Sequence, residues 1–220
     1  MKAIILAAGR GERMMPLTKN TPKPLLNAKG KPLIEHSISA LKKAGITNIV
    51  INTAYLGEQI QTHLGNGKKF GVRLQYSTEQ YALETAGGII QALPLLDDQP
   101  FIAINSDILC DYDLSLLTLP PNSLAHLVLV DNPKHHPNGD FFIGTGQKIT
   151  FHKNNCLTFS GIGIYHPNFF KNYIHIQGAL ALYSLFKEAI DSQQLTGEQY
   201  SGYWQDIGTP KRLELINQQI

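Results

Sequence analysis

The chain has 220 residues, of which 43% are hydrophobic and 16% are charged, and its formal net charge is +2. This composition suits one globular domain with a full core, whereas a nucleic-acid-binding protein more often has a basic stripe and a membrane protein a longer apolar run. The apolar stretch at the N-terminus is too short for a signal peptide, and the two cysteines lack metal or redox spacing, so we expect a cytoplasmic protein with free thiols.

The first half of the chain predicts alternating strands and helices. Continuous apolar runs predict buried strands, and apolar residues at helical spacing predict helices between them. The expected strands are 2–6, 48–52, 73–76 and 101–105, and the expected helices are 33–44, 56–64 and 85–93. Continuous apolar strands separated by helices are typical of a parallel sheet that is covered on both faces.

The second half of the chain is richer in predicted strands. The expected elements are strands at 124–130 and 157–165, a β-hairpin of 141–143 and 148–152 around the turn 144–147, and helices near 167–173 and 180–193. Thr209 is a candidate N-cap, and Pro210 suits the first position of a final helix. Because no linker or repeat interrupts the pattern, we expect one α/β domain with a β-rich insertion in its second half.

The opening strand runs directly into a small turn that contains Gly9 and Gly11. Such a turn presents backbone N–H groups that no side chain covers, and it can hold an anion such as a triphosphate. Arg13 and Lys23 supply positive charge nearby, and the prolines on both sides of Lys23 stiffen its backbone. An ordinary tight turn is the alternative, because the third glycine of a dinucleotide fold and the Gly-Lys-Ser/Thr phosphate loop are both absent.

Two aspartates are candidate ligands for a divalent cation. Asp107 follows the strand 101–105, and ligands of open α/β sheets bind beyond the carboxyl ends of strands. Asp206 precedes a glycine turn and the last predicted helix. Mg²⁺ takes few protein ligands and keeps water and phosphate oxygens as the others, so two carboxylates and a triphosphate make a sensible site. Local capping is the alternative for each aspartate.

Two further patterns fit either a role in ligand binding or a purely structural role. Gly87 and Gly88 near a predicted helix start allow close approach of a ligand, or equally close packing of helix on sheet. His135 and His136 are adjacent, so their side chains point apart and do not make a paired metal site.

Together these segments resemble the sugar-1-phosphate nucleotidylyltransferases. That family is marked by Leu-Ala-Ala-Gly-x-Gly-x-Arg-Met, here 6–14, and then by Pro-Lys-Pro-Leu, here 22–25. A metal-binding aspartate follows its fourth main strand, here Asp107, and a second lies in a Trp-x-Asp-Ile-Gly-Thr-Pro segment, here 204–210. The resemblance covers almost the whole chain. It implies a Rossmann-like three-layer sandwich with a mostly parallel mixed central sheet and a small β-rich sugar-binding insertion.

The same resemblance implies a single nucleotidyltransferase domain over 1–220, with nucleotide binding mainly in 1–107 and sugar binding mainly in 108–220. The expected partners are UTP and a sugar 1-phosphate, with Mg²⁺ as cofactor and with no nucleic acid, membrane or obligate protein partner. The expected catalytic residues are Arg13, Lys23 and Asp107, and the expected metal ligands are Asp107 and Asp206. The expected nucleotide-binding residues are Ala8, Gly9, Gly11, Glu12, Arg13, Lys23, Glu79 and Gly88, and the expected sugar-binding residues are Asn105, Asp140 and Ser160.

Within the family, several stretches are most similar to the members that use UTP and N-acetylmuramate 1-phosphate in bacterial cell-wall sugar recycling. These stretches are 11–14, 83–85, 125–133, 139–141 and 157–162. Glu12 stands where most members have threonine, and Ser106 stands where members usually have glycine. Some mannose-1-phosphate guanylyltransferases resemble this chain in having Asn-Ser-Asp there. The segment 144–155 is less similar. The alternatives are therefore GTP with mannose 1-phosphate, UTP or dTTP with glucose 1-phosphate, and an inactive sugar-nucleotide sensor.

Overall fold

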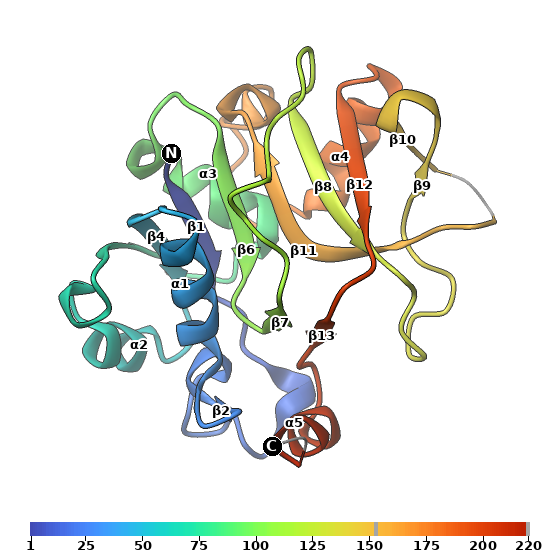
Figure 1. Ribbon diagram of the computed structural model, residues 1–220. Coiled ribbons are helices and arrows are strands. Elements are labelled where there is room, and N and C mark those ends of the chain that lie inside the picture. Colours follow the sequence, from blue (N-terminus) through green and yellow to red (C-terminus); the bar gives the residue numbers. More distant parts are fainter. Residues whose placement is uncertain (152–153, 219–220) are drawn as a thin grey trace.

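The computed structural model describes residues 1–151 and 154–218, and its centre is a seven-stranded sheet in the order β12-β8-β11-β6-β1-β4-β5 (Figure 1). Its strands are β1 (Ala3–Leu6), β4 (Asn48–Thr53), β5 (Arg73–Thr78), β6 (Phe101–Asn105), β8 (Ala125–Val130), β11 (Thr158–Tyr165) and β12 (Leu195–Tyr200). The strands β5, β4, β1 and β6 are parallel to one another, and β12 is parallel to β8. Only β11 among these strands is antiparallel to its neighbours, β6 and β8. The mostly parallel mixed sheet is thus confirmed.

Helices cover both faces of this sheet (Figure 1). The helices are α1 (Leu33–Lys43), α2 (Gly57–Leu64), α3 (Glu84–Leu96), α4 (Leu182–Asp191) and α5 (Pro210–Asn217). Successive side chains of a strand point to opposite faces, so Ile5 packs with the apolar residues of α1 and α2, whereas Ile4 packs with those of α3 and α4. Both isoleucines are fully buried, which explains why the strand is apolar throughout.

In the described part of the chain, three small two-stranded ladders flank the central sheet. They are β2 (Asn27–Ala28) with β3 (Lys31–Pro32), β7 (Ile108–Cys110) with β13 (Trp204–Asp206), and β9 (Phe142–Ile143) with β10 (Ile149–Thr150). The ladder β7–β13 matters most for function, because it joins the segment after β6 to the segment before α5. Two stretches about half the chain apart in sequence therefore lie side by side.

The predicted elements of the first half are confirmed to within a few residues, as is the hairpin around 144–147, although residue 152 of that prediction lies outside the described residues. The helix expected at 167–173 is wrong in length, since only a short 3₁₀ turn, Pro167–Phe170, forms there. The strands β7, β12 and β13 were not predicted. The division into a nucleotide half and a sugar half stays a prediction. Across residues 1–151 and 154–218, no helix has the length and apolar character needed to cross a membrane.

Candidate active site

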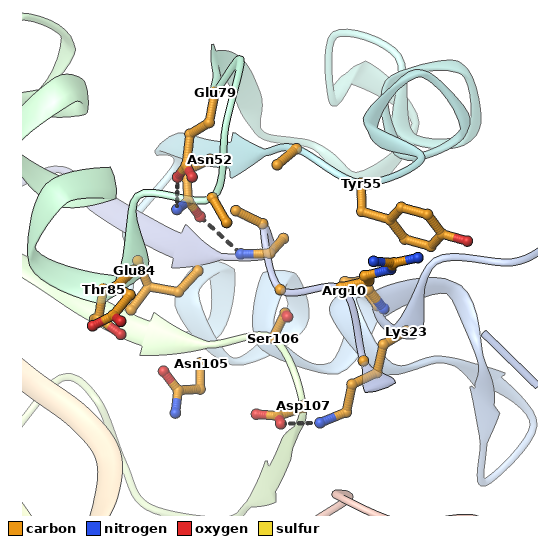
Figure 2. Close-up of a pocket in the computed structure, with 18 of the residues that line it drawn as sticks. Arg10, Lys23, Asn52, Tyr55, Glu79, Glu84, Thr85, Asn105, Ser106 and Asp107 are labelled. Carbon is orange, nitrogen blue, oxygen red and sulfur yellow. Dashed lines mark hydrogen bonds and ion pairs between the residues drawn. The ribbon is translucent and has the colours of Figure 1, made fainter. Parts of the chain in front are cut away.

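A cleft of about 920 Å³ lies beyond the carboxyl ends of β1, β4 and β6 (Figure 2). The parallel register of these strands brings the segment after each of them to the same edge of the sheet. The described residues that line the cleft are 6–14, 23–24, Asn52, 54–55, 79–85, 105–107 and Gly208. The expected residues Ala8, Gly9, Gly11, Glu12, Arg13, Lys23, Glu79, Asn105 and Asp107 are all among them.

The opening loop takes its shape from Gly11, which has a left-handed φ of +68°. A Cβ at this position would lie 3.0 Å from Thr18 Cγ2 and 3.1 Å from Lys23 Cβ, so glycine lets the loop, Thr18 and Lys23 pack together. Thr18 Oγ1 also donates a hydrogen bond of 2.8 Å to the Gly11 carbonyl. Gly9 has no atom within 4 Å of its Cβ position, so its backbone faces open space. The loop is therefore rigid at one glycine and accessible at the other.

The cleft contains a cation that sequence reasoning did not select. The guanidinium of Arg10 lies 5.5 Å from the centre of the Tyr55 ring and 4.0 Å from a carboxylate oxygen of Glu12 (Figure 2). Tyr55 follows β4, so the contact joins the opening loop to a neighbouring strand end. Glu12 and Arg13 are exposed to solvent.

Lys23 and Asp107 form an ion pair on the floor of the cleft (Figure 2). Lys23 starts a short 3₁₀ turn directly after Pro22, and Asp107 follows β6. Their side chains are 12% and 25% exposed, respectively, so solvent screens the pair only in part. The structure thus brings together the two residues that the sequence predicted as the phosphate-binding cation and the metal-binding carboxylate.

Asp206 lies beside Asp107 in the backbone, because β13 pairs with β7 and the N–H of Ile207 donates to the Asp107 carbonyl over 2.8 Å. The Asp206 carboxylate accepts a hydrogen bond of 2.7 Å from Arg212 Nη1, and His135 Nε2 lies 3.1 Å from the same oxygen. Among the described residues that line the cleft, Gly208 is present and Asp206 is not.

Gly208 allows Arg212 to reach Asp206. A Cβ at position 208 would overlap Arg212 Nη2, so another residue there would displace the guanidinium. Arg212 stands in the first turn of α5, which Thr209 caps by accepting the Arg212 N–H at 3.3 Å. The predicted N-cap is thereby confirmed, and the glycine and arginine add a support for Asp206 that sequence reasoning missed.

The donor set around Asp107 and Asp206 suits a hard cation. Asp206 pairs with Ile108 in the β7–β13 ladder, and Asp107 directly precedes Ile108. Both side chains are carboxylates, and carboxylate oxygen is the ligand type that Mg²⁺ prefers. Within residues 1–151 and 154–218, no three His, Cys, Asp or Glu side chains group as a ready-made metal site. Mg²⁺ usually relies on one or two carboxylates and takes its other ligands from substrate phosphates and water.

A buried polar network connects the opening loop to the start of α3 (Figure 2). The Ala7 N–H donates to Asn52 Oδ1 at 2.8 Å, and Asn52 Nδ2 donates to Glu79 Oε1 at 2.7 Å. The second oxygen of Glu79 accepts the Leu83 N–H at 3.1 Å. Burial raises the pKa of Glu79, although these two hydrogen bonds oppose the shift. Asn52 was not predicted, yet it fixes the loop from beneath.

Gly88 serves this network from α3. A Cβ at position 88 would lie 2.5 Å from Glu79 Oε1 and 2.6 Å from Asn52 Nδ2, and Gly88 does not line the cleft. Gly88 therefore makes room for the pair that holds the loop, and its expected contact with the nucleotide stays a prediction. Gly87 likewise serves packing, since its Cβ position lies 2.9 Å from the Gly178 carbonyl.

The Gly88→Ala variant should lose about 1–3 kcal/mol of unfolding free energy, because the added methyl group overpacks the buried network. Its affinity for UTP should also fall, since the opening loop loses its support. Urea denaturation and calorimetric UTP binding measure the two effects. The matched variant Gly9→Ala has open space for its methyl group, so its unfolding free energy should equal that of the native protein. Unchanged stability of Gly88→Ala would contradict the packing role.

A side pocket of about 300 Å³ adjoins the cleft. The two cavities share the lining residues Leu6, Glu84, Thr85 and Asn105. Asp140 stands at the side pocket, where its Oδ2 accepts the Phe159 N–H at 2.8 Å and its Oδ1 lies 3.0 Å from His136 Nε2. Two predicted sugar-binding residues, Asn105 and Asp140, therefore face one cavity.

Gly161 creates the space that Asn105 occupies. It lies where the register of β11 is irregular, and its φ is +81°. The Asn105 amide fills the space that a Cβ at position 161 would need. Ser160, in contrast, is 1% exposed, and its hydroxyl donates to the Val128 carbonyl at 2.6 Å and accepts the Ile162 N–H at 3.1 Å. The Ser160 hydroxyl therefore holds the bulge of β11, and its expected contact with the sugar stays a prediction.

Comparison with known proteins agrees with this geometry. Residues 2–141 match the family model described as Nucleotidyl transferase. The chain is 48% identical to the N-acetylmuramate alpha-1-phosphate uridylyltransferase of Neisseria meningitidis, over 97% of this chain and 96% of that protein. It is 31% identical to the mannose-1-phosphate guanyltransferase of Hypocrea jecorina over 96% of this chain, which spans 62% of that protein.

A solved structure has the same architecture. It is a putative glucose-1-phosphate thymidylyltransferase from Bacillus anthracis, which superposes with a TM-score of 0.86 at 25% sequence identity. The match covers 100% of this chain and 94% of that one. Both halves of the fold, including β11, β12 and α5, therefore have a counterpart.

Proposed function

This chain belongs to the nucleotidyl transferase family, and from that premise we propose that it transfers UMP from UTP to N-acetylmuramate 1-phosphate, with release of pyrophosphate. The observation that carries the proposal is the 48% identity over 97% of the chain to a protein named for that reaction. The identity to the mannose-1-phosphate relative is 31%. A role in cell-wall sugar recycling in the cytoplasm belongs to the same proposal.

The proposed reaction needs orientation and charge neutralisation rather than a base. A phosphate oxygen of the sugar 1-phosphate attacks the α-phosphorus of UTP and forms a new P–O bond. The bond from the α-phosphorus to the bridging oxygen breaks, and that oxygen leaves with pyrophosphate. Because the attacking oxygen is already anionic, the protein must hold two polyanions together and stabilise the charge of the transition state.

The residues of the cleft suit these tasks. Lys23 would contact the α-phosphate, while Arg13 and the backbone N–H groups of Gly11 and Glu12 would hold the β- and γ-phosphates. Lys23 and Asp107 neutralise each other in the free protein, so a bound triphosphate gives the lysine a new anionic partner and leaves the carboxylate available. Asn105 and Asp140 are the candidates for hydrogen bonds to the sugar hydroxyls.

Asp107 and Asp206 would hold one Mg²⁺, which when bound would neutralise phosphate charge in the transition state. Arg212 and His135 orient the Asp206 carboxylate, and the β7–β13 ladder fixes its backbone beside that of Asp107. Orientation by neighbouring groups is usual for carboxylates that bind metals.

Pyrophosphate release over a grid of nucleotides and sugar 1-phosphates tests the proposal. UTP with N-acetylmuramate 1-phosphate should give the highest kcat/KM. A higher value for GTP with mannose 1-phosphate, or for UTP or dTTP with glucose 1-phosphate, would contradict the proposed sugar. UTP binding without pyrophosphate release from any pair would instead support a sugar-nucleotide sensor.

A further inference from the structure

The side pocket has aromatic walls and a buried aromatic floor. Phe141 and Phe186 meet edge to face with ring centres 5.4 Å apart, and Phe159 and Phe186 do so at 5.9 Å. Tyr165 lies at the floor, where it is 1% exposed and packs against Phe169 at 5.5 Å. Rings in mutual contact have few alternative positions, so the pocket is preformed around an apolar group.

The Tyr165 hydroxyl is buried and has no hydrogen-bond partner among the described residues. The tyrosine ring folds back over Gly163, where a Cβ would lie 3.0 Å from the hydroxyl. Tyr165 itself lines the side pocket, as does Gly161 on the same strand. Buried polar groups without a partner are rare in folded proteins because each one is destabilising, and such a group at the floor of a cavity points to a ligand.

The charges around the side pocket limit what that ligand can be. Its described lining residues include the carboxylates Asp140 and Glu84 and include no lysine, arginine or histidine. These two carboxylates disfavour a ligand group with negative charge, although Glu84 is exposed and His136 Nε2 lies 3.0 Å from Asp140 Oδ1. The pocket therefore favours a neutral group with an apolar end and a hydrogen-bond acceptor.

We propose that the side pocket binds the acetamido group of the sugar and that the Tyr165 hydroxyl donates a hydrogen bond to the acetamido carbonyl. This inference rests on the proposed function, because it takes N-acetylmuramate 1-phosphate as the substrate. That sugar phosphate has three distinctive substituents. Its phosphate and its lactyl carboxylate are anionic, whereas its acetamido group is neutral and has a methyl group and a carbonyl oxygen. Only the acetamido group matches the apolar walls, the acidic rim and the unpaired donor. Tyr165 thus becomes a specificity-determining residue.

The Tyr165→Phe variant tests the hydrogen bond. N-acetylglucosamine 1-phosphate and glucose 1-phosphate differ only in carrying an acetamido or a hydroxyl group, so their inhibition constants isolate the acetamido contribution. The native protein should bind the N-acetylated sugar phosphate more tightly, and the variant should lose about five- to tenfold of that preference, as expected for one hydrogen bond. The inhibition constant of glucose 1-phosphate should not change.

Two controls separate this role from a structural one. The Tm of Tyr165→Phe should not fall below that of the native protein, because the removed hydroxyl has no partner in the described part of the free protein. The Tyr173→Phe variant loses a hydroxyl that donates to Glu188 at 2.5 Å outside the pocket, and it should keep the native preference. An unchanged preference in Tyr165→Phe, or an equal loss for both sugar phosphates, would overturn the inference.

The failure of this inference differs from the failure of the proposed function. If another nucleotide and sugar pair is turned over best by the native protein, the proposed function fails. If the native protein prefers the N-acetylated sugar phosphate and Tyr165→Phe leaves that preference intact, only the assignment of Tyr165 fails. A native protein without any preference for the acetamido group contradicts the assignment of the pocket.

Discussion

The Asp107→Asn variant should lower kcat for pyrophosphate release by about 10²–10³-fold, the loss typical when one preorganised electrostatic contact is removed. Asparagine keeps the shape of aspartate and removes its charge, so the proposed metal site loses one of its two carboxylates. The variant also takes away the anionic partner of Lys23. Because that pair is partly exposed, the cost in unfolding free energy should be only about 1 kcal/mol.

Three measurements on Asp107→Asn separate catalysis from stability. They are kcat over a range of Mg²⁺ concentrations, calorimetric Mg²⁺ affinity, and Tm. The matched control is Asp97→Asn, which breaks a Lys2–Asp97 ion pair of 2.7 Å outside the cleft and should leave kcat unchanged. Near-native kcat of Asp107→Asn at saturating Mg²⁺ would remove Asp107 from the metal site.

The Lys23→Met variant should lower kcat/KM by about 10²–10³-fold, chiefly through kcat. Methionine keeps an apolar stem that packs against the Gly11 backbone, and it removes the ammonium group from a site where the side chain is only 12% exposed. Charge on the α-phosphate grows during transfer, so a contact made there is stronger in the transition state than in the bound substrate.

Steady-state kinetics with UTP as the varied substrate check the prediction for Lys23. A higher KM with unchanged kcat would mean that Lys23 binds substrate and transition state equally, which would contradict its proposed role. The matched control Lys2→Met removes a lysine that pairs with Asp97 outside the cleft and should change neither constant. Calorimetric UTP affinity distinguishes weak binding from slow chemistry.

The sequence was sufficient for most of the fold because the central strands are apolar on both faces. Ile4 and Ile5 pack on opposite sides of the sheet, and this double burial is what a continuous apolar run predicts. The strand β12 escaped prediction because it lies at the edge of the sheet and carries the polar residues Glu198 and Gln199. The strands β7 and β13 are three residues each, and their pairing depends on the tertiary fold.

Candidate site residues were predictable where they belong to a contiguous motif. Lys23 belongs to the Pro-Lys-Pro-Leu segment and Asp107 directly follows the apolar strand and Asn105-Ser106. The two side chains meet in the cleft. Ser160 and Gly88 were expected at ligands, but their roles follow from neighbours that are distant in sequence, namely Val128 and the Asn52–Glu79 pair. Such contacts have no local signature. The functional roles of all the candidate site residues stay predictions until variants are measured.

A competition experiment tests the central claim most directly. Equal concentrations of N-acetylmuramate 1-phosphate, glucose 1-phosphate and mannose 1-phosphate are incubated with UTP, Mg²⁺ and the protein, and mass spectrometry identifies the nucleotide sugars formed. Most of the product should be UDP-N-acetylmuramate, with one pyrophosphate released for each molecule formed. A majority of UDP-glucose or UDP-mannose, or the absence of any nucleotide sugar, would contradict it.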